Sequence, residues 1–406
     1  MPDLHLLSPA GFRAAGVYAG IKTRQAPDVG LLVCDSPSPT AAAVFTTNKV
    51  FAAPVKIGRE HLAESAGRIR AVVVNSGNAN ACTGRQGDKD ARRMCQFAAG
   101  VAGCQEWEVL PSSTGIIGRL MPMAKVERGI VDAGQYLGNS LEHALLFADA
   151  ILTTDTKRKG AAVEFKVGRQ TVTLAGVCKG SGMIGPRLAL KAKHATMLAY
   201  LTTDVKVPRA ALASLLAEAS DESFNAVTVD DHASTNDTAA LIASGASGAA
   251  VAGRDLRKFA DALKEVCRSL AYQIAADGEG ATKVVVVRVR GASSESAAQA
   301  MARAIANSPL VKCAMHGNDP NWGRIVSAAG FSGAEFDPGK CTLTLQGTVV
   351  FRNGQPVPFD DAKVSASLDA KEVVAELNCR TGKAEATCWT CDLSKEYVTI
   401  NADYHT

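Results

Sequence analysis

The sequence predicts an α/β (α+β) protein with more than one domain. Apolar runs typical of strands, bounded by polar turns, alternate along the chain with segments of helical spacing. A chain of 406 residues can bury a large core, and this length suggests two or three domains. Apolar residues make up 47% and charged residues 21%, which is typical of globular proteins rather than disordered or fibrous ones.

Charge and composition exclude several classes of function. The formal net charge of +4 is small and dispersed, so we expect a small-molecule partner and no nucleic acid. No run of about 18 apolar residues could span a membrane, and the start resembles neither a signal nor a transit peptide. The 11 cysteines form no framework and indicate reduced thiols in the cytoplasm. The pair Cys388 and Cys391 lacks a second pair, so we expect packed strand residues and no metal site.

The first third of the chain reads as strands separated by polar turns. Apolar runs at 30–36, 41–47 and 69–74 predict three strands, and helical spacing over 87–103 predicts a helix with Asp88 at its N-cap. The intervening asparagines could position a ligand or support the helix: Asn75, Asn78 and Asn80.

The middle third predicts further strands and helices around a glycine-rich turn. A strand at 109–114 runs into a turn with Gly115, a helix near 140–152 precedes Thr153, and a hairpin turns at Gly168. The hairpin delivers Lys179 and the string GSGMIG, which matches a dinucleotide pattern. That pattern belongs in the first turn of a βαβ unit, so we expect no dinucleotide here.

The remaining chain alternates in the same way. We expect a short apolar segment after residue 196, a helix opened by Pro208, a polar loop, a helix over 254–276 and a buried strand from 282. Beyond these the sequence predicts a helix at 293–308, strands over 341–351, a helix around 371–377 and a final strand from Tyr397.

Thr196 stands out chemically because it heads an apolar run just after a basic segment. A threonine hydroxyl is a poor nucleophile unless a base lies nearby, and an N-terminal threonine can use its own amine, which titrates at about 7.7 to 8.0. For Thr196 this requires a cut at Ala195-Thr196. The same hydroxyl could make that cut by attacking the Ala195 carbonyl and passing through an ester.

The segments KGSGMI and ATMLAYLTTD resemble the processing segment of the ornithine acetyltransferase (glutamate N-acetyltransferase) family of arginine biosynthesis. Members of that family cleave themselves before this threonine. The likeness covers essentially the whole chain, through GFRAAGVYAGIK, NSGNANACTG, SSTGIIG, ILTTDT, STNDT, DGEGATK, DPNWGRI and YVTINADYHT.

The resemblance implies a fold and an assembly. It implies a mixed α/β sandwich of the self-processing N-terminal-nucleophile type over 1–282, and a smaller α+β domain over 283–406 that completes the substrate site. The sandwich would contain the cut, giving fragments 1–195 and 196–406, and two copies of each would form a heterotetramer.

The resemblance also implies the reaction and its residues. Acetyl would pass from N-acetylornithine to glutamate by ping-pong kinetics through an acetyl ester on Thr196, with acetyl-CoA as a possible second donor and no bound cofactor. Thr114 and Gly115 would form the oxyanion hole. The residues implied in substrate binding are Thr153, Lys179, Thr196, Glu279, Asn401 and Thr406.

Two departures from the family pattern keep alternatives open. About six extra residues lie between Gly185 and His194, and the string DDHA, with Asp230 and Asp231, replaces the family's GDT. The chain could therefore be an uncleaved, catalytically silent homologue that binds amino acids. An aminopeptidase-like amidase with a freed N-terminal nucleophile is a further alternative.

Overall fold

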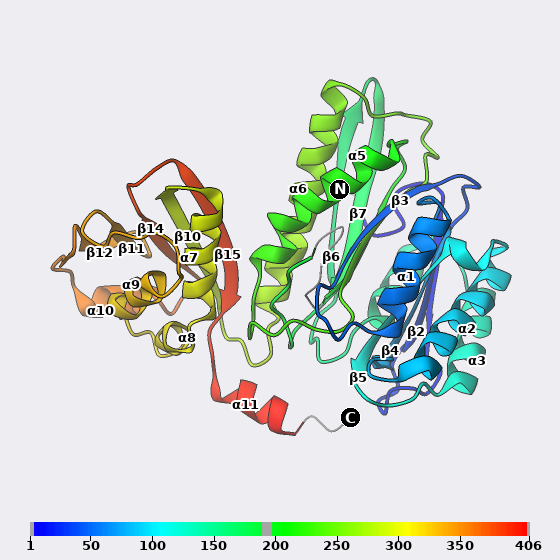
Figure 1. Ribbon diagram of the computed structural model, residues 1–406, viewed down its shortest axis with the longest axis horizontal. Helices are drawn as coiled ribbons and strands as arrows, with labels where there is room; N and C mark the ends of the chain where they lie inside the picture. Colours follow the sequence, from blue (N-terminus) through cyan, green and yellow to red (C-terminus); the bar gives the residue numbers. More distant parts are fainter. Residues whose placement is uncertain (1–3, 189–196, 404–406) are drawn as a thin grey trace. The chain divides into compact units, whose positions relative to one another are not determined.

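The computed structural model describes residues 4–188 and 197–403, which divide into two compact units. The first unit contains residues 4–225 and 232–270, and the second contains 226–231 and 271–403. Figure 1 labels most helices and strands of the two units. Among the described helices, none is long and apolar enough to cross a membrane.

The first unit contains two mixed sheets. In both sheets one pair of strands is parallel, β4–β5 in the first and β8–β9 in the second, and the other pairs are antiparallel. The four-stranded sheet has the order β1 (Phe12–Val17), β2 (Val29–Cys34), β4 (Ala71–Asn78), β5 (Val109–Ile116). The five-stranded sheet has the order β3 (Thr40–Phe45), β9 (Thr238–Ala243), β8 (Leu198–Thr203), β7 (Gln170–Lys179), β6 (Lys159–Val167).

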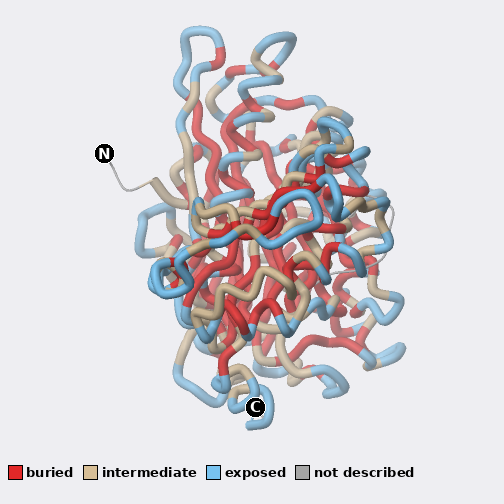
Figure 2. Tube along the Cα trace, turned by 90° about the vertical axis from the view of Figure 1, so that its left-hand side faces the viewer, coloured by how far each residue is buried: buried red, intermediate tan, exposed pale blue. Residues whose placement is uncertain are grey.

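An apolar core between the two sheets makes this unit a sandwich. Val72 and Val74 of β4 share one buried cluster with Leu198 of β8 and with Tyr200. The Tyr200 ring meets Phe147 of α4 (Leu141–Ala150) edge to face, with ring centroids 5.5 Å apart. Every residue of β2, β8 and β9 is buried, as expected for strands covered on both faces (Figure 2). The predicted mixed α/β sandwich is therefore confirmed.

Helices cover the outer faces of the sandwich. Helices α2 (Gly84–Ala102) and α3 (Met123–Gln135) pack their apolar sides on the four-stranded sheet, where Met94 and Ile130 join Leu31 in a second buried cluster. Helix α5 (Arg209–Asp221) packs on β3, and α6 (Arg254–Ala276) packs on β7, where Gly176 faces Leu270. Helix α1 (Ala53–Glu64) packs against β5 and α2.

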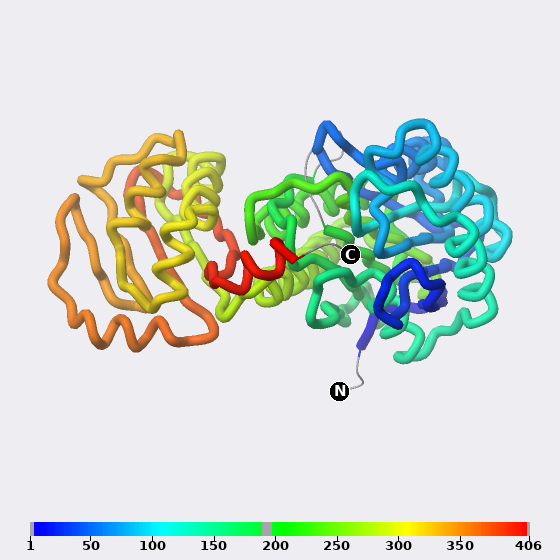
Figure 3. The backbone as a smooth tube through the Cα atoms, turned by 90° about the horizontal axis from the view of Figure 1, so that it is seen from below, coloured from blue at the N-terminus to red at the C-terminus, as the bar shows by residue number. Residues whose placement is uncertain are grey.

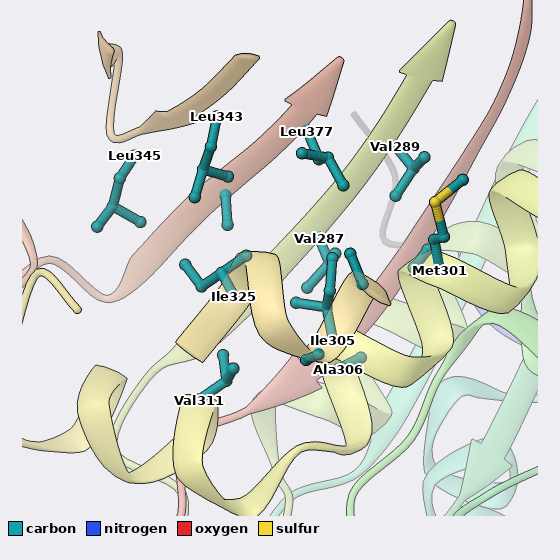
Figure 4. Packing of buried hydrophobic residues seen from close by; sticks show 14 of the residues in the cluster. Val287, Val289, Met301, Ile305, Ala306, Val311, Ile325, Leu343, Leu345 and Leu377 are labelled. Atoms are coloured by element: carbon teal, nitrogen blue, oxygen red, sulfur yellow. The ribbon is translucent and has the colours of Figure 1, made fainter. Parts of the chain in front are cut away.

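The second unit is built on a six-stranded mixed sheet. The strand order is β13 (Gln355–Pro356), β12 (Thr348–Arg352), β11 (Thr342–Leu345), β14 (Glu372–Asn378), β10 (Val284–Ala292), β15 (Ala384–Cys391). Its apolar core is shared by helices α7 (Glu295–Asn307), α8 (Pro309–His316), α9 (Trp322–Gly330) and, through Val364, by the short helix α10 (Asp361–Ser367). Figure 4 shows Val287 and Leu377 of the sheet facing Ile305 and Ile325 of these helices. Helix α10 precedes β14.

Three local predictions are wrong. Residues 371–377, expected to be a helix, are mostly strand β14, held between β10 and β11. The final strand expected from Tyr397 is helix α11 (Lys395–Ala402), red in Figures 1 and 3. Helix α2 begins at Gly84 after Thr83, so Asp88 lies inside the helix and is not its N-cap. The hairpin at Gly168 and the helix opened by Pro208 are confirmed.

Candidate active site

Thr114 and Gly115 lie near the end of β5 at an irregularity in its pairing with β4. Asn78 faces both Thr114 and Ile116 across the strands, so the register shifts here. Gly115 has a φ of +131°, and a Cβ at this position would lie 2.4 Å from the carbonyl carbon of Gly77. Only glycine allows β4 and β5 to approach so closely at this point.

The asparagine cluster supports this irregular pairing. The Asn75 side chain accepts a hydrogen bond from Ser113 Oγ (2.6 Å) and donates one to Asn78 O (2.9 Å). Asn78 Nδ2 in turn donates to the carbonyls of Arg119 and Leu120, which belong to the turn after β5. The amide groups therefore hold the end of β5 in place, and this structural role explains the cluster.

Thr153 and Lys179 are brought together by a buried carboxylate, Asp155. The Thr153 backbone N-H donates to Asp155 Oδ2 (3.1 Å), and the backbone N-H of Gly180, next to Lys179, donates to Asp155 Oδ1 (2.6 Å). Lys159 Nζ donates to the same oxygen at 2.7 Å. The side chains of Asp155 and Lys159 are both at most 1% exposed, and Lys179 is 3% exposed.

The charges around Asp155 keep it ionised. Burial raises the pKa of its carboxyl, but the nearby charges of Lys179 and Lys159 outweigh burial, so that the pKa lies below its usual range. Lys159 pairs across the hairpin with Cys178, the neighbour of Lys179. Two lysines thus converge on one carboxylate inside the first unit.

A second buried acid, Asp237, lies next to the start of β8. The Thr238 N-H donates to Met197 O at 2.8 Å, which ties the Asp237 segment to the first described residue after the predicted cut. Neither carboxyl oxygen of Asp237 accepts a hydrogen bond from a described residue. Burial raises its pKa well above the usual range, although the charge of Lys179 opposes the shift.

Sequence reasoning gave no role to Asp155, Lys159 or Asp237. The sequence showed only the residue types, since ILTTDT and STNDT hold the two acids. Their burial, however, depends on contacts between distant segments.

The second unit brings Glu279 and Asn401 together. Glu279 lies between α6 and β10 and is 8% exposed, and its Oε2 accepts a hydrogen bond from Asn401 Nδ2 at 2.8 Å. Gly280 has a φ of +69°, and a Cβ there would lie 2.5 Å from the Tyr397 backbone nitrogen, so glycine lets α11 approach this loop. Tyr397 Oη donates to Asp230 Oδ2 (3.3 Å), and Asp231 pairs with Arg303 (3.6 Å).

The predicted cut and one substrate contact lie outside the described residues. These are Ala195, Thr196 and Thr406, together with most of the extra residues that precede the cut. The strands on either side are described: β7 ends at Lys179, β8 begins at Leu198, and these two residues face each other in an antiparallel pair. The prediction that the flanking strands share one sheet is confirmed.

One further feature of the described residues is a pocket away from the predicted site residues. A shallow pocket in the second unit contains none of the predicted residues and is lined by Asp319, Pro320, Asn321, Trp322, Gly323, Phe359, Asp361, Ala362 and Ser365. Over residues 4–188 and 197–403, no three His, Cys, Asp or Glu side chains are grouped so that they could hold a metal ion.

Comparison with known proteins identifies the family. The model of the ArgJ family matches residues 13–406. The arginine biosynthesis bifunctional protein ArgJ of Symbiobacterium thermophilum is 47% identical over 404 residues, covering 98% of each chain. The Geobacillus kaustophilus protein of the same name is 42% identical over 407 residues, covering 100% of this chain and 97% of its own.

Two solved structures are also similar. The crystal structure of the arginine biosynthesis bifunctional protein argJ from Bacillus halodurans has 38% identity and a TM-score of 0.51, covering 52% of this chain and 100% of its own. The ornithine acetyltransferase of Mycobacterium tuberculosis, in complex with ornithine, has 39% identity and a TM-score of 0.44, covering 47% of this chain and 98% of its own. On the match over residues 13–406 and the identity to full-length relatives, the chain belongs to the ArgJ family.

Proposed function

We propose that this enzyme of the ArgJ family moves the acetyl group of N2-acetyl-L-ornithine to L-glutamate in arginine biosynthesis. The observation that carries the proposal is the family match over residues 13–406, with relatives named arginine biosynthesis bifunctional protein at 42–47% identity. Because these relatives are named bifunctional, we assign acetyl-CoA as a second acetyl donor to the same site. The substrates are amino acids, and no cofactor takes part.

Thr196 is the nucleophile of this proposal, after cleavage at Ala195-Thr196. Its hydroxyl attacks the acetyl carbonyl while its own amine takes the proton; the amide C-N bond breaks, and the proton passes to the departing nitrogen of ornithine. The amine of glutamate then attacks the acetyl ester, which regenerates the hydroxyl. The Thr196 amine can serve as the base in both half-reactions because it gives up the proton it has taken before each half-reaction ends.

The other site residues have roles that fit their chemistry. Thr114 and Gly115 donate to the oxyanion of the tetrahedral intermediate, where a donor is worth roughly two to three orders of magnitude in turnover. The buried ammonium of Lys179 suits the substrate carboxylate, and the carboxylate of Glu279 suits a substrate ammonium. Thr153, Asn401 and Thr406 supply further polar contacts to the same amino acid.

Two observations support processing. The described strands on either side of the cut, β7 and β8, are neighbours, so that both fragments would contribute strands to one sheet. The solved Bacillus halodurans chain is covered completely by 52% of this chain, and residues 196–406 are 211 of the 406 residues, the same share.

The assembly and compartment follow from the same proposal. Two copies of each fragment form a heterotetramer in the cytoplasm, where the free thiols of all 11 cysteines stay reduced.

The test combines peptide chemistry with kinetics. Purified protein should run as fragments of 195 and 211 residues on a denaturing gel, with Thr196 as a new N-terminus, and Thr196→Ala should stay intact. Varying both substrates should give parallel double-reciprocal lines, and quenching with N-acetylornithine should add one acetyl mass to the fragment beginning at Thr196.

The contrary outcomes separate the alternatives. An intact chain that binds ornithine without transferring acetyl would be the silent homologue, whereas release of free acetate without transfer to glutamate would indicate an amidase. Intersecting lines without an acetylated fragment would mean direct transfer and would remove Thr196 from its role.

A further inference from the structure

Asp155 connects two segments that each carry a proposed substrate contact. One of its oxygens accepts the Thr153 N-H from the loop after α4, and the other accepts the Gly180 N-H at the end of β7. These donors lie 27 residues apart in the sequence. Because the Asp155 side chain has no exposed surface, water does not replace either hydrogen bond when it is lost.

The same carboxylate lies in the field of two buried lysines. Lys159 Nζ lies 2.7 Å from Asp155 Oδ1, and Lys159 and Lys179 come from adjacent strands of the hairpin. Like charges in a buried site repel unless an opposite charge lies between them. The ionised carboxylate therefore offsets the repulsion between the two lysines.

We propose that Asp155 is a positioning residue for acetyl transfer, holding Thr153 and Lys179 at the separation that the amino-acid substrate requires. The inference rests on the proposed function, which uses both residues as substrate contacts. Asp155 itself need not touch the substrate, since its two oxygens are occupied by Thr153, Gly180 and Lys159.

The test is steady-state kinetics of the complete, processed enzyme with Asp155→Asn. Asparagine has nearly the same shape, but its amide has one acceptor oxygen, so an N-H donor of Thr153 or Gly180 then faces another donor. We expect KM to rise about tenfold or more for both N-acetylornithine and glutamate, the effect of weakening a contact to a charged group. Turnover per acetylated fragment should change much less.

A matched control and two further variants separate positioning from folding. Asp149→Asn removes an acid of α4 that pairs with Arg158 at the surface, and it should leave KM within about twofold. Asp155→Glu keeps the charge and should give an intermediate KM. If Asp155→Asn does not fold, Asp155→Asn/Lys159→Gln removes both members of the buried pair and should fold with a raised KM.

A purely structural role predicts a different result. A folding defect lowers the amount of active enzyme and leaves the KM of the remaining molecules unchanged. An unchanged KM in Asp155→Asn or in the double variant would therefore overturn the inference. Absence of acetyl transfer by the unaltered enzyme would instead overturn the proposed function.

Discussion

The Asp237 carboxyl is buried. It must therefore be either neutral or paired with a group that lies outside the described residues. Thr46 Oγ1 donates to Ser234 O at 2.7 Å, and neither carboxyl oxygen of Asp237 accepts a hydrogen bond from a described residue. Burying an unpaired charge is costly, and burial raises the pKa of the Asp237 carboxyl, although the charge of Lys179 opposes the shift.

Replacing this acid with its neutral isostere should therefore stabilise the enzyme at neutral pH. In the unfolded chain Asp237 ionises above about pH 4, whereas in the folded chain its raised pKa lets it keep its proton to higher pH. The native enzyme therefore loses stability as pH rises from about 4 toward that raised pKa, by at most about 1.4 kcal/mol per pH unit. The Asp237→Asn variant has no carboxyl at this position and should not lose stability in this way. The difference in thermal midpoint, variant minus unaltered enzyme, should therefore become larger from pH 5 to pH 8.

A lower stability of the Asp237→Asn variant would be equally informative. If Asp237→Asn is less stable than the unaltered enzyme at pH 8, the carboxyl is ionised and paired, and the argument from burial is wrong. A difference in midpoint that does not change with pH would show that the acid has the same pKa in both states.

At the same scale, the sequence suggested candidate site residues but did not reveal which acids are buried. Lys179, Thr114 and Glu279 could be named because they stand in strings that resemble a known family. Asp155 could not be assigned, because its environment is made by Gly180, 25 residues later in the chain. An aspartate in a polar string is equally compatible with an exposed turn, and only the fold decides between the two.

Because β4 and β5 approach closely at Gly115, we expect this glycine to be required for stability. Gly115→Ala should lose stability for two reasons: its φ of +131° costs an L-residue about 1–3 kcal/mol, and overlap with the Gly77 backbone adds a comparable amount. Gly118 also has a positive φ, +84°, but a Cβ there would meet nothing within 4 Å. Gly118→Ala is therefore the control for backbone strain alone.

The two variants should differ in thermal midpoint. We expect Gly115→Ala to melt several degrees lower than Gly118→Ala, because only the first adds a steric overlap between the strands. Equal midpoints would mean that β4 and β5 can move apart at no cost, and the irregular register at Asn78 would then not depend on glycine.

The two elements whose type was predicted wrongly, β14 and α11, show that tertiary contacts can override the local sequence pattern. In β14 the buried residues are Val373, Ala375 and Leu377, a period of two that the apolar neighbour Val374 obscured in the sequence. In α11 the β-branched residues Val398, Thr399 and Ile400 favour a strand, yet the segment forms a helix without a buried residue after Ser394. A serine followed by Glu396 was the sequence signal for this helix start.

At the scale of the whole molecule, alternation of strands and helices predicted the class but not the division into units. Residues 226–231 belong to the second unit, where Val227 bridges to Trp389 in β15. These two residues are 162 positions apart, and no periodicity in either segment indicates that they meet. Long-range pairing of this kind comes from packing, which a single sequence does not reveal.

The order of the five-stranded sheet predicts how the processed fragments behave. Strands β3, β7 and β6 come from residues before the cut, while β8 and β9 come from residues after it and lie between β3 and β7. Removing the later fragment would break the pairing of β7 with β8 and of β3 with β9, and it would expose Phe147, which is fully buried beside Tyr200. We therefore expect both fragments to elute together from a gel-filtration column in native buffer. Thr196→Ala, a single band on a denaturing gel, should give the same native elution volume, because the pairing does not depend on the cut. Release of fragment 1–195 in native buffer would contradict this strand order.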